Sequence, residues 1–339
     1  MRISEFWRYI MKLTIIIPVY NKKRYLSGLL EQVMGQTFRD FECLLIDDGS
    51  TDGSGAICDE FANRDTRFRV FHIPNGGASH ARNLGLDHAR GEYVTFIDGD
   101  DSILPNHLDS LVSSIEHSSA DLVISALDKV TDSGTLVHTV CSQHDGTWKF
   151  SEILSGFSAE QSGSGIFGYC VGKIFARELA RDVRFDEGLK LAEDFDFYLN
   201  LYRQIDTVHF SDARTYLYLL EAENSTGNTA SERIDYLAQL RINLRYRDML
   251  RHRGVWSGEN QQIVEERLRS YAHFVLFHTP MPLYRERFDA LYQIYQAEDF
   301  PLIPMNILGK WLFFCLRHNQ YTAARLTMQL YRLARRLRR

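Results

Sequence analysis

Three carboxylates stand within four positions at the end of the stretch Gly91 to Asp101. The apolar part of this stretch is rich in β-branched and aromatic residues, which predicts a buried strand. Asp98, Asp100 and Asp101 repel one another there, so they need a cation or solvent. Because open parallel sheets bind ligands outside the carboxyl ends of their strands, oxygen ligands for a hard divalent ion are one interpretation. An acidic turn before the next helix is the other, since Asp is common in turns.

Several earlier apolar runs alternate with helical patterns. The predicted strands are residues 13–20, 41–46, 68–73 and the opening stretch, and the helices cover about 21–36, a segment after Gly53, 79–89 with Ser79 as its cap, and about 105–116. This alternation predicts an α/β fold with right-handed crossovers and a mostly parallel sheet flanked by helices. The first, second and fourth strands all end in polar residues, so ligand-binding loops are expected to converge at one edge.

The pattern changes after residue 120. The predictions are a strand at 120–126, a hairpin turn at 132–134 into 135–140, a Ser/Gly-rich mobile loop at 141–165, a helix from about 191, a strand at 208–220, a polar loop at 221–231 and helices from about 232 to the end. Acids in the first turn of the helix from 191 are also favoured by the helix dipole, which is a purely structural explanation for them. A domain boundary is therefore placed at 222–231.

Length and composition are those of a globular protein. A chain of 339 residues suggests one large or two ordinary domains, and the net charge of −5 gives no general case for nucleic acid as a partner. Five widely spaced cysteines without a C-x-x-C motif indicate buried thiols and a reducing compartment. There is no apolar run of membrane-spanning length and no leader pattern, which favours a cytoplasmic protein. Met11 immediately precedes the first strand, so residues 1–11 are interpreted as an N-terminal extension.

Taken together, the motifs resemble those of the family 2 glycosyltransferases, enzymes of the GT-A fold that move sugars from nucleotide-sugar donors. The matching segments are 15–21 (IIIPVYN), 36–38 (QTF), 47–54 (DDGSTDGS), 75–85 (NGGASHARNLG), 91–93 (GEY), 98–101 (DGDD) and the later pair Glu193-Asp194. The resemblance covers about 12–225 and is with the bacterial surface-polysaccharide type. It implies a GT-A catalytic domain at 12–225 and a C-terminal helical region at 226–339.

The resemblance assigns roles to the acids of the opening stretch. In the family, the second acid of an Asp-x-Asp motif binds a divalent ion and the first contacts the ribose. Carried over, Asp100 is the metal ligand and Asp98 the ribose contact, while Asp101 is left as a possible extra ligand. A divalent ion offsets the charge that develops on a departing nucleoside diphosphate. Mn²⁺ and Mg²⁺ both suit oxygen ligands and phosphates.

The resemblance also implies a nucleobase pocket. Pro18, Tyr20 and Asp48 correspond to it, because an aromatic ring stacks on a base and a carboxylate accepts a base N–H. Tyr20 could instead be a packing residue at a strand end. Arg82 could pair with a donor phosphate or brace Asp48 or Asp98 as a structural ion pair.

Sugar transfer to a hydroxyl needs a base. The family's base is the aspartate of a Glu-Asp pair, here Asp194, with Asp196 as a competitor that would not share its helix face. One base and an in-line displacement imply an inverting transfer from a nucleotide-diphosphate donor, with a UDP-sugar favoured. The expected enzyme is a hexosyl- or N-acetylhexosaminyl-transferase acting on a hydroxyl of a glycan or lipid-linked acceptor in surface-polysaccharide synthesis.

Two features depart from the family pattern, and the sequence also bears on two other functions. The family often has Asn before the lysine of Gly172-Lys173, and Arg where this chain has Leu219-Leu220. A nucleotide-dependent oxidoreductase is rejected because the turn after the first strand lacks a G-x-G-x-x-G motif. A catalytically silent relative that serves as a nucleotide-sugar-binding or assembly module stays open, although Asp98, Asp100 and Asp194 are all present.

The C-terminal segment has a charge of its own. Residues 301–339 contain eight Lys or Arg and no acid, which leaves −13 for the first 300 residues. Leu326, Leu330, Leu333 and Leu337 recur at helical spacing with arginines between them. This pattern suits an amphipathic helix resting on an anionic membrane surface, and hence a peripheral location at the inner face of the membrane. It equally suits a helix packed on the protein with a solvated basic face.

Overall fold

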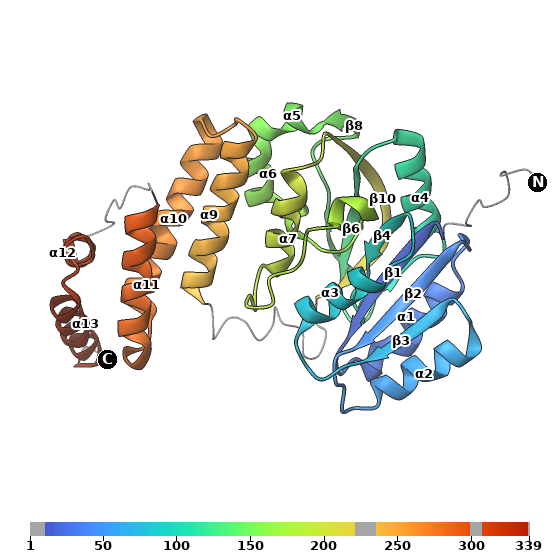
Figure 1. Cartoon of the computed structure of the whole chain (residues 1–339), viewed down its shortest axis with the longest axis horizontal. Helices are drawn as coiled ribbons and strands as arrows, with labels where there is room; N and C mark the ends of the chain where they lie inside the picture. The colour runs from blue at the N-terminus through green and yellow to red at the C-terminus, as the bar shows by residue number, and fades with distance from the viewer. Residues whose placement is uncertain (1–10, 221–234, 299–306, 338–339) are drawn as a thin grey trace, which may run out of the picture. The chain divides into compact units, whose positions relative to one another are not determined.

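The chain forms two compact units, Met1–Glu232 and Arg233–Arg339. The computed structural model describes residues 11–220, 235–298 and 307–337 (Figure 1). The body of the N-terminal extension, the polar loop predicted at 221–231 and the expected boundary within it lie outside the described residues.

The first half of unit one has the predicted alternation of strands and helices. Its elements are β1 (Leu13–Val19), α1 (Lys23–Met34), β2 (Phe41–Asp47), α2 (Ser54–Arg64), β3 (Phe68–His72), α3 (Ala78–His88) and β4 (Tyr93–Phe96). The four strands are parallel, in the order β3-β2-β1-β4. The predicted apolar face of α1 is buried through Leu26, Leu29, Leu30 and Val33. One detail is wrong: Ser79 does not cap α3, because Gly77 holds the N-cap position with φ of 92°.

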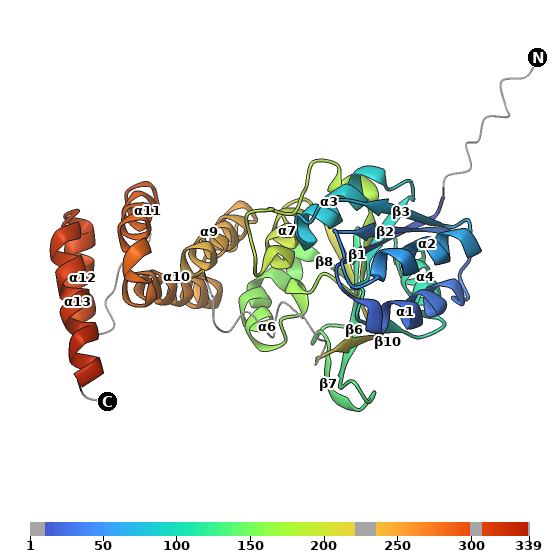
Figure 2. The same ribbon diagram turned by 90° about the horizontal axis from the view of Figure 1, so that it is seen from below.

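The strand order reverses beside β1. The chain moves outward from β1 to β2 and β3, then crosses back and adds β4 on the other side of β1. Right-handed crossovers therefore place α1 and α3 on opposite faces of the sheet (Figure 2). The carboxyl ends of β1 and β4 flank this reversal, and ligands of open α/β sheets bind at such a point.

Beyond β4 the sheet is mixed. The later elements are β5 (Ser102–Ile103), α4 (His107–Ser118), β6 (Leu122–Val130), β7 (Leu136–Val140), β9 (Lys173–Ala176), a 3-10 helix η3 (Arg177–Ala180), α7 (Glu193–Tyr202) and β10 (Thr207–Leu219). β9 is antiparallel to both neighbours, β4 and β6, while β6 and β10 are parallel. β7 pairs with β6 as an antiparallel hairpin, which confirms the predicted turn at 132–134.

The mobile loop predicted at 141–165 is wrong. This segment contains β8 (Gly146–Lys149), α5 (Phe150–Ile153), η1 (Leu154–Gly156) and α6 (Phe157–Gly163), followed by η2 (Ile166–Gly168). Phe150, Phe157 and Phe167 are fully buried and pack with Tyr202 of α7. Scattered aromatic residues thus anchor a Ser/Gly-rich stretch against α7.

Unit two is helical, as predicted. It contains α9 (Tyr236–His252), α10 (Gly258–His278), η5 (Met281–Leu283), α11 (Tyr284–Ala297), α12 (Ile307–Arg317) and α13 (Tyr321–Leu337). Each of these α-helices packs against its neighbour in sequence, and α11 also contacts α13. Among the described residues, no helix is both long and apolar enough to cross a bilayer.

The approach of Gly91 to β1 gives a prediction about stability. A Cβ on Gly91 would lie 2.4 Å from the Thr14 amide nitrogen and 2.6 Å from the Leu13 carbonyl carbon. Backbone atoms cannot move aside as a side chain does, so Gly91→Ala should lower the free energy of unfolding by about 1–3 kcal/mol. Chemical denaturation measures this change.

The matched control is Gly28→Ala. Gly28 lies within α1, and a Cβ there would meet nothing within 4 Å. Alanine should therefore raise the free energy of unfolding by about 0.5–1 kcal/mol. Equal effects from the two substitutions would contradict the close approach at Gly91.

Candidate active site

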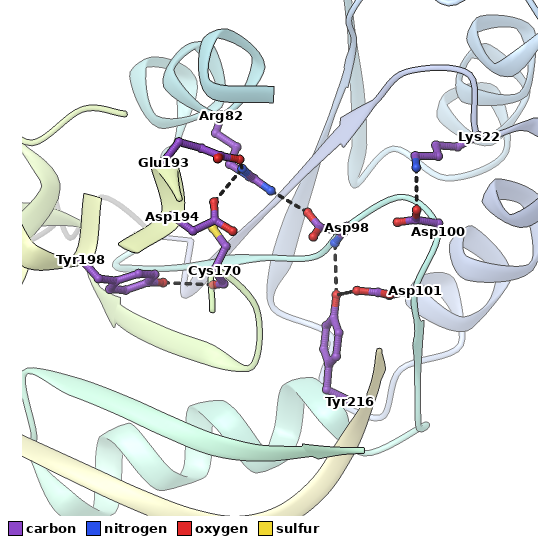
Figure 3. Close-up of polar contacts among 10 residues, drawn as sticks. All are labelled: Lys22, Arg82, Asp98, Asp100, Asp101, Cys170, Glu193, Asp194, Tyr198 and Tyr216. Carbon is purple, nitrogen blue, oxygen red and sulfur yellow. Dashed lines mark hydrogen bonds and ion pairs between the residues drawn. The ribbon is translucent and has the colours of Figure 1, made fainter. Parts of the chain in front are cut away.

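A buried guanidinium joins two distant parts of the chain. Arg82 of α3 places Nη2 2.8 Å from Oδ1 of Asp98, in the loop after β4, and Nη1 2.8 Å from Oδ1 of Asp194, at the start of α7 (Figure 3). Nη1 also lies 3.4 Å from Oε1 of Glu193. The Arg82 side chain is only 5% exposed. Burial acts to lower its pKa, but the surrounding carboxylates, Asp194 foremost, hold that pKa well above the usual value.

Neighbouring contacts hold Arg82 in this position. Asn83 pairs with the backbone of Phe185, donating to its carbonyl at 3.0 Å and accepting from its amide at 2.8 Å. The Phe185 ring lies under the Arg82 guanidinium and stacks on Phe197 of α7, with ring centroids 4.1 Å apart. α3 and α7 are thereby fixed to one another, so the guanidinium reaches acids from both.

The pKa of the Asp194 carboxyl is unusually high. Burial raises its pKa to about 7; the Arg82 charge opposes this rise, and the charges of Glu193 and Asp98 add to it. Its side chain is nevertheless 26% exposed, whereas Asp196, the competitor named from the sequence, is 1% exposed. A partly accessible carboxyl that is half ionised near neutral pH is suited to accept a proton.

Asp101 is hydrogen-bonded within the protein. The Tyr216 hydroxyl donates to Oδ2 of Asp101 at 2.6 Å, and the Leu219 amide donates to Oδ1 at 2.9 Å. The same hydroxyl accepts from the Asp98 amide at 3.1 Å. Burial raises the pKa of Asp101, and the nearby charges of Asp98 and Asp100 raise it further. Asp101 therefore ties the acidic loop to β10, and its oxygens are engaged within the protein.

Asp100 faces a lysine. Its Oδ2 lies 2.5 Å from Nζ of Lys22, which follows β1, and these side chains are 13% and 14% exposed. In the described part of the chain, no group of three or more His, Cys, Asp or Glu could hold a metal ion. Mg²⁺ is commonly bound by one or two carboxylates together with substrate phosphates. Asp100 is therefore better suited to bind an ion together with a substrate diphosphate than to be part of a metal site made of protein ligands alone.

The residues predicted for the nucleobase lie on neighbouring strand ends. Asp48 follows β2 and accepts from the Gly76 and Gly77 amides at 2.7 and 2.8 Å, which fixes the loop before α3. Pro18 lies in β1, and its carbonyl oxygen would be 3.2 Å from a Cβ on Gly99 of the acidic loop. Tyr20, just after β1, is 45% exposed.

The structure therefore joins Arg82, Asp98 and Asp194 directly. Arg82 braces Asp98 rather than Asp48, which favours the ion-pair interpretation; a direct donor contact stays a prediction. Lys22 and Tyr216 are not marked as site residues by the sequence. Lys22 stands next to Asn21 of a matched motif, but nothing in its local pattern showed that it would reach Asp100, 78 positions later.

Lys173, the lysine of Gly172-Lys173, is buried beside this network. It is 1% exposed, donates to the Phe167 and Tyr169 carbonyls, and lies 4.0 Å from the ring centroid of Tyr198. Burial lowers its pKa to about 7. Its bonds to two carbonyls fix the segment before β9, and its ammonium lies over a ring of α7.

Comparison with known proteins places the chain in a family. The model for glycosyl transferase family 2 matches residues 14–181. The glycosyltransferase GlyG of Streptococcus pneumoniae is 30% identical over 226 residues, which span 61% of this chain and 70% of GlyG. The chain belongs to the family 2 glycosyltransferases. The minor teichoic acid biosynthesis protein GgaB of Bacillus subtilis is 29% identical over 53% of this chain and 20% of its own length.

The fold is shared with a solved structure. A crystal structure of S. aureus TarS 1-349 in complex with UDP-GlcNAc has a TM-score of 0.65 and 22% identity, and the match covers 96% of this chain and 92% of that one. This likeness supports the GT-A fold expected from the sequence.

The environment of Asp194 gives a prediction about its titration. The carboxyl should titrate near pH 7, and Glu193→Gln should lower this pKa because it removes a negative charge that raises it. Since the folded-state pKa exceeds that of an unfolded aspartate, the folded state binds the extra proton, and this group makes the free energy of unfolding fall as pH rises from about 4 to about 7. Carboxyl ¹³C NMR of aspartate-labelled protein, assigned with Asp194→Asn, measures the pKa.

The control for this titration is Glu178→Gln. Glu178 is exposed and pairs with Arg181 rather than with Arg82. Its removal should leave the pKa of Asp194 unchanged. A titration of Asp194 near pH 4 in the unmodified protein would show that burial does not control this carboxyl.

Proposed function

We propose that this chain is an inverting glycosyltransferase that moves a sugar from a nucleoside-diphosphate donor to an acceptor hydroxyl. The observation that carries the proposal is the bridge through Arg82. It connects Asp98, on the loop at the strand reversal, with Asp194, on the helix beside it. A donor held at that loop would therefore present its reacting carbon to the side where Asp194 lies.

The donor side is proposed from the three strand ends. The exposed ring of Tyr20 is available to stack on a base, with Pro18 and Asp48 forming the surroundings of that pocket. Asp98 is proposed to contact the ribose and Asp100 to bind Mn²⁺ or Mg²⁺. When bound, such an ion would stabilise the negative charge of the departing diphosphate. The UDP-GlcNAc complex of TarS supports a UDP-sugar as donor.

The transfer step is assigned to Asp194. Its carboxylate accepts the proton of the acceptor hydroxyl as the hydroxyl oxygen forms a bond to the anomeric carbon. The bond from that carbon to the diphosphate oxygen breaks, and the nucleoside diphosphate leaves with the electron pair. One displacement inverts the configuration at the anomeric carbon. The deep burial of Asp196 argues for Asp194 as the base.

The acceptor is proposed to be a glycan or lipid-linked saccharide in cell-surface polysaccharide synthesis. GgaB, a minor teichoic acid biosynthesis protein, is a relative that supports this role. A hexosyl and an N-acetylhexosaminyl donor are both compatible with the proposal.

Two isosteric substitutions separate donor binding from transfer. UDP-, GDP-, dTDP- and CMP-sugars are screened with Mn²⁺ for binding and for transfer or hydrolysis. Asp100→Asn should lose metal-dependent donor binding, because an amide is a poor ligand for the ion. Asp194→Asn should keep donor binding but lose transfer by about 10²–10⁴-fold, since a general base is removed.

Asp109→Asn is the matched control for this experiment. Asp109 is an exposed aspartate in the first turn of α4, and its substitution should change neither binding nor transfer. Full transfer by Asp194→Asn would refute the assignment of the base. Donor binding without any transfer by the unmodified chain would favour the silent binding module instead.

We also propose that unit two rests on an anionic membrane surface at the cytoplasmic side. Leu326, Leu330 and Leu333 of α13 share one helix face and are more than half exposed, while Ala324 and Met328 of the same helix are buried. Trp311 and Phe314 of α12 stack on one another and are also exposed, and Trp311 donates to Thr327 of α13. The absence of acids from 301–339 makes this segment electrostatically complementary to anionic lipid.

A vesicle assay tests the membrane proposal. The unmodified chain should sediment with phosphatidylglycerol vesicles, and less with phosphatidylcholine vesicles. A triple substitution of Leu326, Leu330 and Leu333 to Gln should reduce this binding, because apolar contact with the interface is lost.

Substituting Leu136 and Val137 with Gln is the control for this assay. Both are exposed apolar residues of β7 in unit one, and their loss should leave vesicle binding unchanged. Equal sedimentation of the triple variant and the unmodified chain would show that α13 does not face lipid.

A further inference from the structure

Lys22 occupies the place where a cation is expected at Asp100. Its Nζ lies 2.5 Å from Oδ2 of Asp100, and both side chains are largely withdrawn from solvent (Figure 3). Lys22 follows β1 and Asp100 follows β4, so the pair bridges the two strand ends that flank the reversal of strand order. Among the described residues, Lys22 is the hydrogen-bonding partner of the Asp100 carboxylate.

The position of Lys22 is held by its surroundings. Its backbone amide donates to Oγ of Ser54 at 2.9 Å, and that fully buried hydroxyl donates to Asp52 at 2.7 Å. The aliphatic stem lies against Gly99, because a Cβ on that glycine would be 3.4 Å from Cγ of Lys22. A fixed backbone and a packed stem direct the ammonium group toward the acidic loop.

This ion pair conflicts with a divalent ion on the same carboxylate. A divalent cation binds carboxylate oxygen at about 2.0–2.2 Å, so an ammonium retained at Oδ2 would stand beside it as a like charge. Binding of a divalent ion at this carboxylate therefore favours the departure of Lys22 from Asp100. A lysine carries a compact charge on a flexible four-carbon stem, so Lys22 can turn to another anion without movement of its backbone.

We infer that Lys22 is an exchangeable counter-ion, which neutralises Asp100 in the donor-free enzyme and turns to the donor's diphosphate when a divalent ion takes Asp100. The inference rests on the proposed function, because it requires a nucleoside-diphosphate donor. A divalent ion alone repels the Lys22 ammonium from Asp100 and offers Lys22 no new partner. A divalent ion that arrives with a diphosphate supplies one, so the two ligands bind cooperatively and each tightens the other by the same factor.

The exchange has a role in the ordering of the site. Without Lys22, the carboxylate of Asp100 would lie close to Asp98 and Asp101 with no cation of its own. With Lys22, the acidic loop keeps its shape before the donor arrives, and the ammonium then adds positive charge beside the leaving diphosphate. Lys22 is thus a positioning residue in the free enzyme and a phosphate contact in the loaded one.

The test measures Mn²⁺ affinity by electron paramagnetic resonance of free Mn²⁺, with and without UDP. In Lys22→Met, which keeps the stem and removes the charge, Mn²⁺ alone should bind about 5-fold or more tightly than in the unmodified enzyme, within the usual range of coupling between sites. The factor by which UDP tightens Mn²⁺ binding should fall in the same variant. Binding of Mn²⁺ to UDP in solution is common to all samples and cancels in the comparison between variants.

Two further variants make the result specific to charge and position. Lys22→Arg keeps a cation and should keep Mn²⁺ binding weak in the absence of UDP. Lys23→Met removes the neighbouring exposed lysine and should behave as the unmodified enzyme. If Lys22→Met does not fold, as judged by thermal unfolding, Lys22→Gln replaces it.

The outcomes separate this inference from the proposed function. Mn²⁺ binding to Lys22→Met that is no tighter than in the unmodified enzyme, with UDP still bound, overturns the exchange of Lys22 and leaves the transferase proposal intact. Tight UDP binding by the unmodified enzyme that does not respond to Mn²⁺, and that weakens in Lys22→Met, shows that Lys22 is a permanent replacement for the ion, which also overturns the exchange. Failure of the unmodified enzyme to bind any nucleoside diphosphate removes the proposed donor, and the inference with it.

Discussion

The site depends on one buried cation shared by several acids. Asp98, Glu193 and Asp194 come from segments almost a hundred residues apart, and the Arg82 guanidinium stands among them as their shared counter-ion. Removing one partner of a buried charge network costs about 3–5 kcal/mol, since the remaining charges are left without compensation. The start of α7 is therefore held against the loop after β4 by charge as well as by the packing of Phe185 on Phe197.

The strand order explains why these acids meet. Because β4 returns to the far side of β1, the loops after β1 and β4 flank the reversal, and α3 crosses between them with Arg82 on it. The crossovers and the acidic strand ends were predictable from the sequence, since apolar runs alternate with helical patterns and right-handed connections leave few alternatives. The position of Asp98 near the carboxyl end of β1 follows from that topology.

Other parts of the structure depend on contacts that no local pattern records. β9 is antiparallel between β4 and β6 although its sequence does not differ from that of a parallel strand. The sequence of 141–165 predicts a loop, because the order of this stretch comes from Phe150 and Phe157 packing on Tyr202, which is about fifty residues away in the chain. Family resemblance indicates Asp194 as a candidate base, but its raised pKa depends on burial and on the nearby charges of Glu193 and Asp98, against the opposing charge of Arg82, and only folding creates this environment.

The three acids of the opening stretch show how a repulsive cluster is tolerated without a ligand. Each carboxylate has a different partner: Asp98 has a guanidinium, Asp100 an ammonium, and Asp101 a phenol and a backbone amide. These partners differ in how readily they can be exchanged. The guanidinium is bound to three acids and the phenol is buried, whereas the ammonium ends a flexible stem and has one acid. A ligand that binds at this loop therefore displaces the partner of Asp100 most easily, because the Lys22 ammonium is the one partner of the three that can leave.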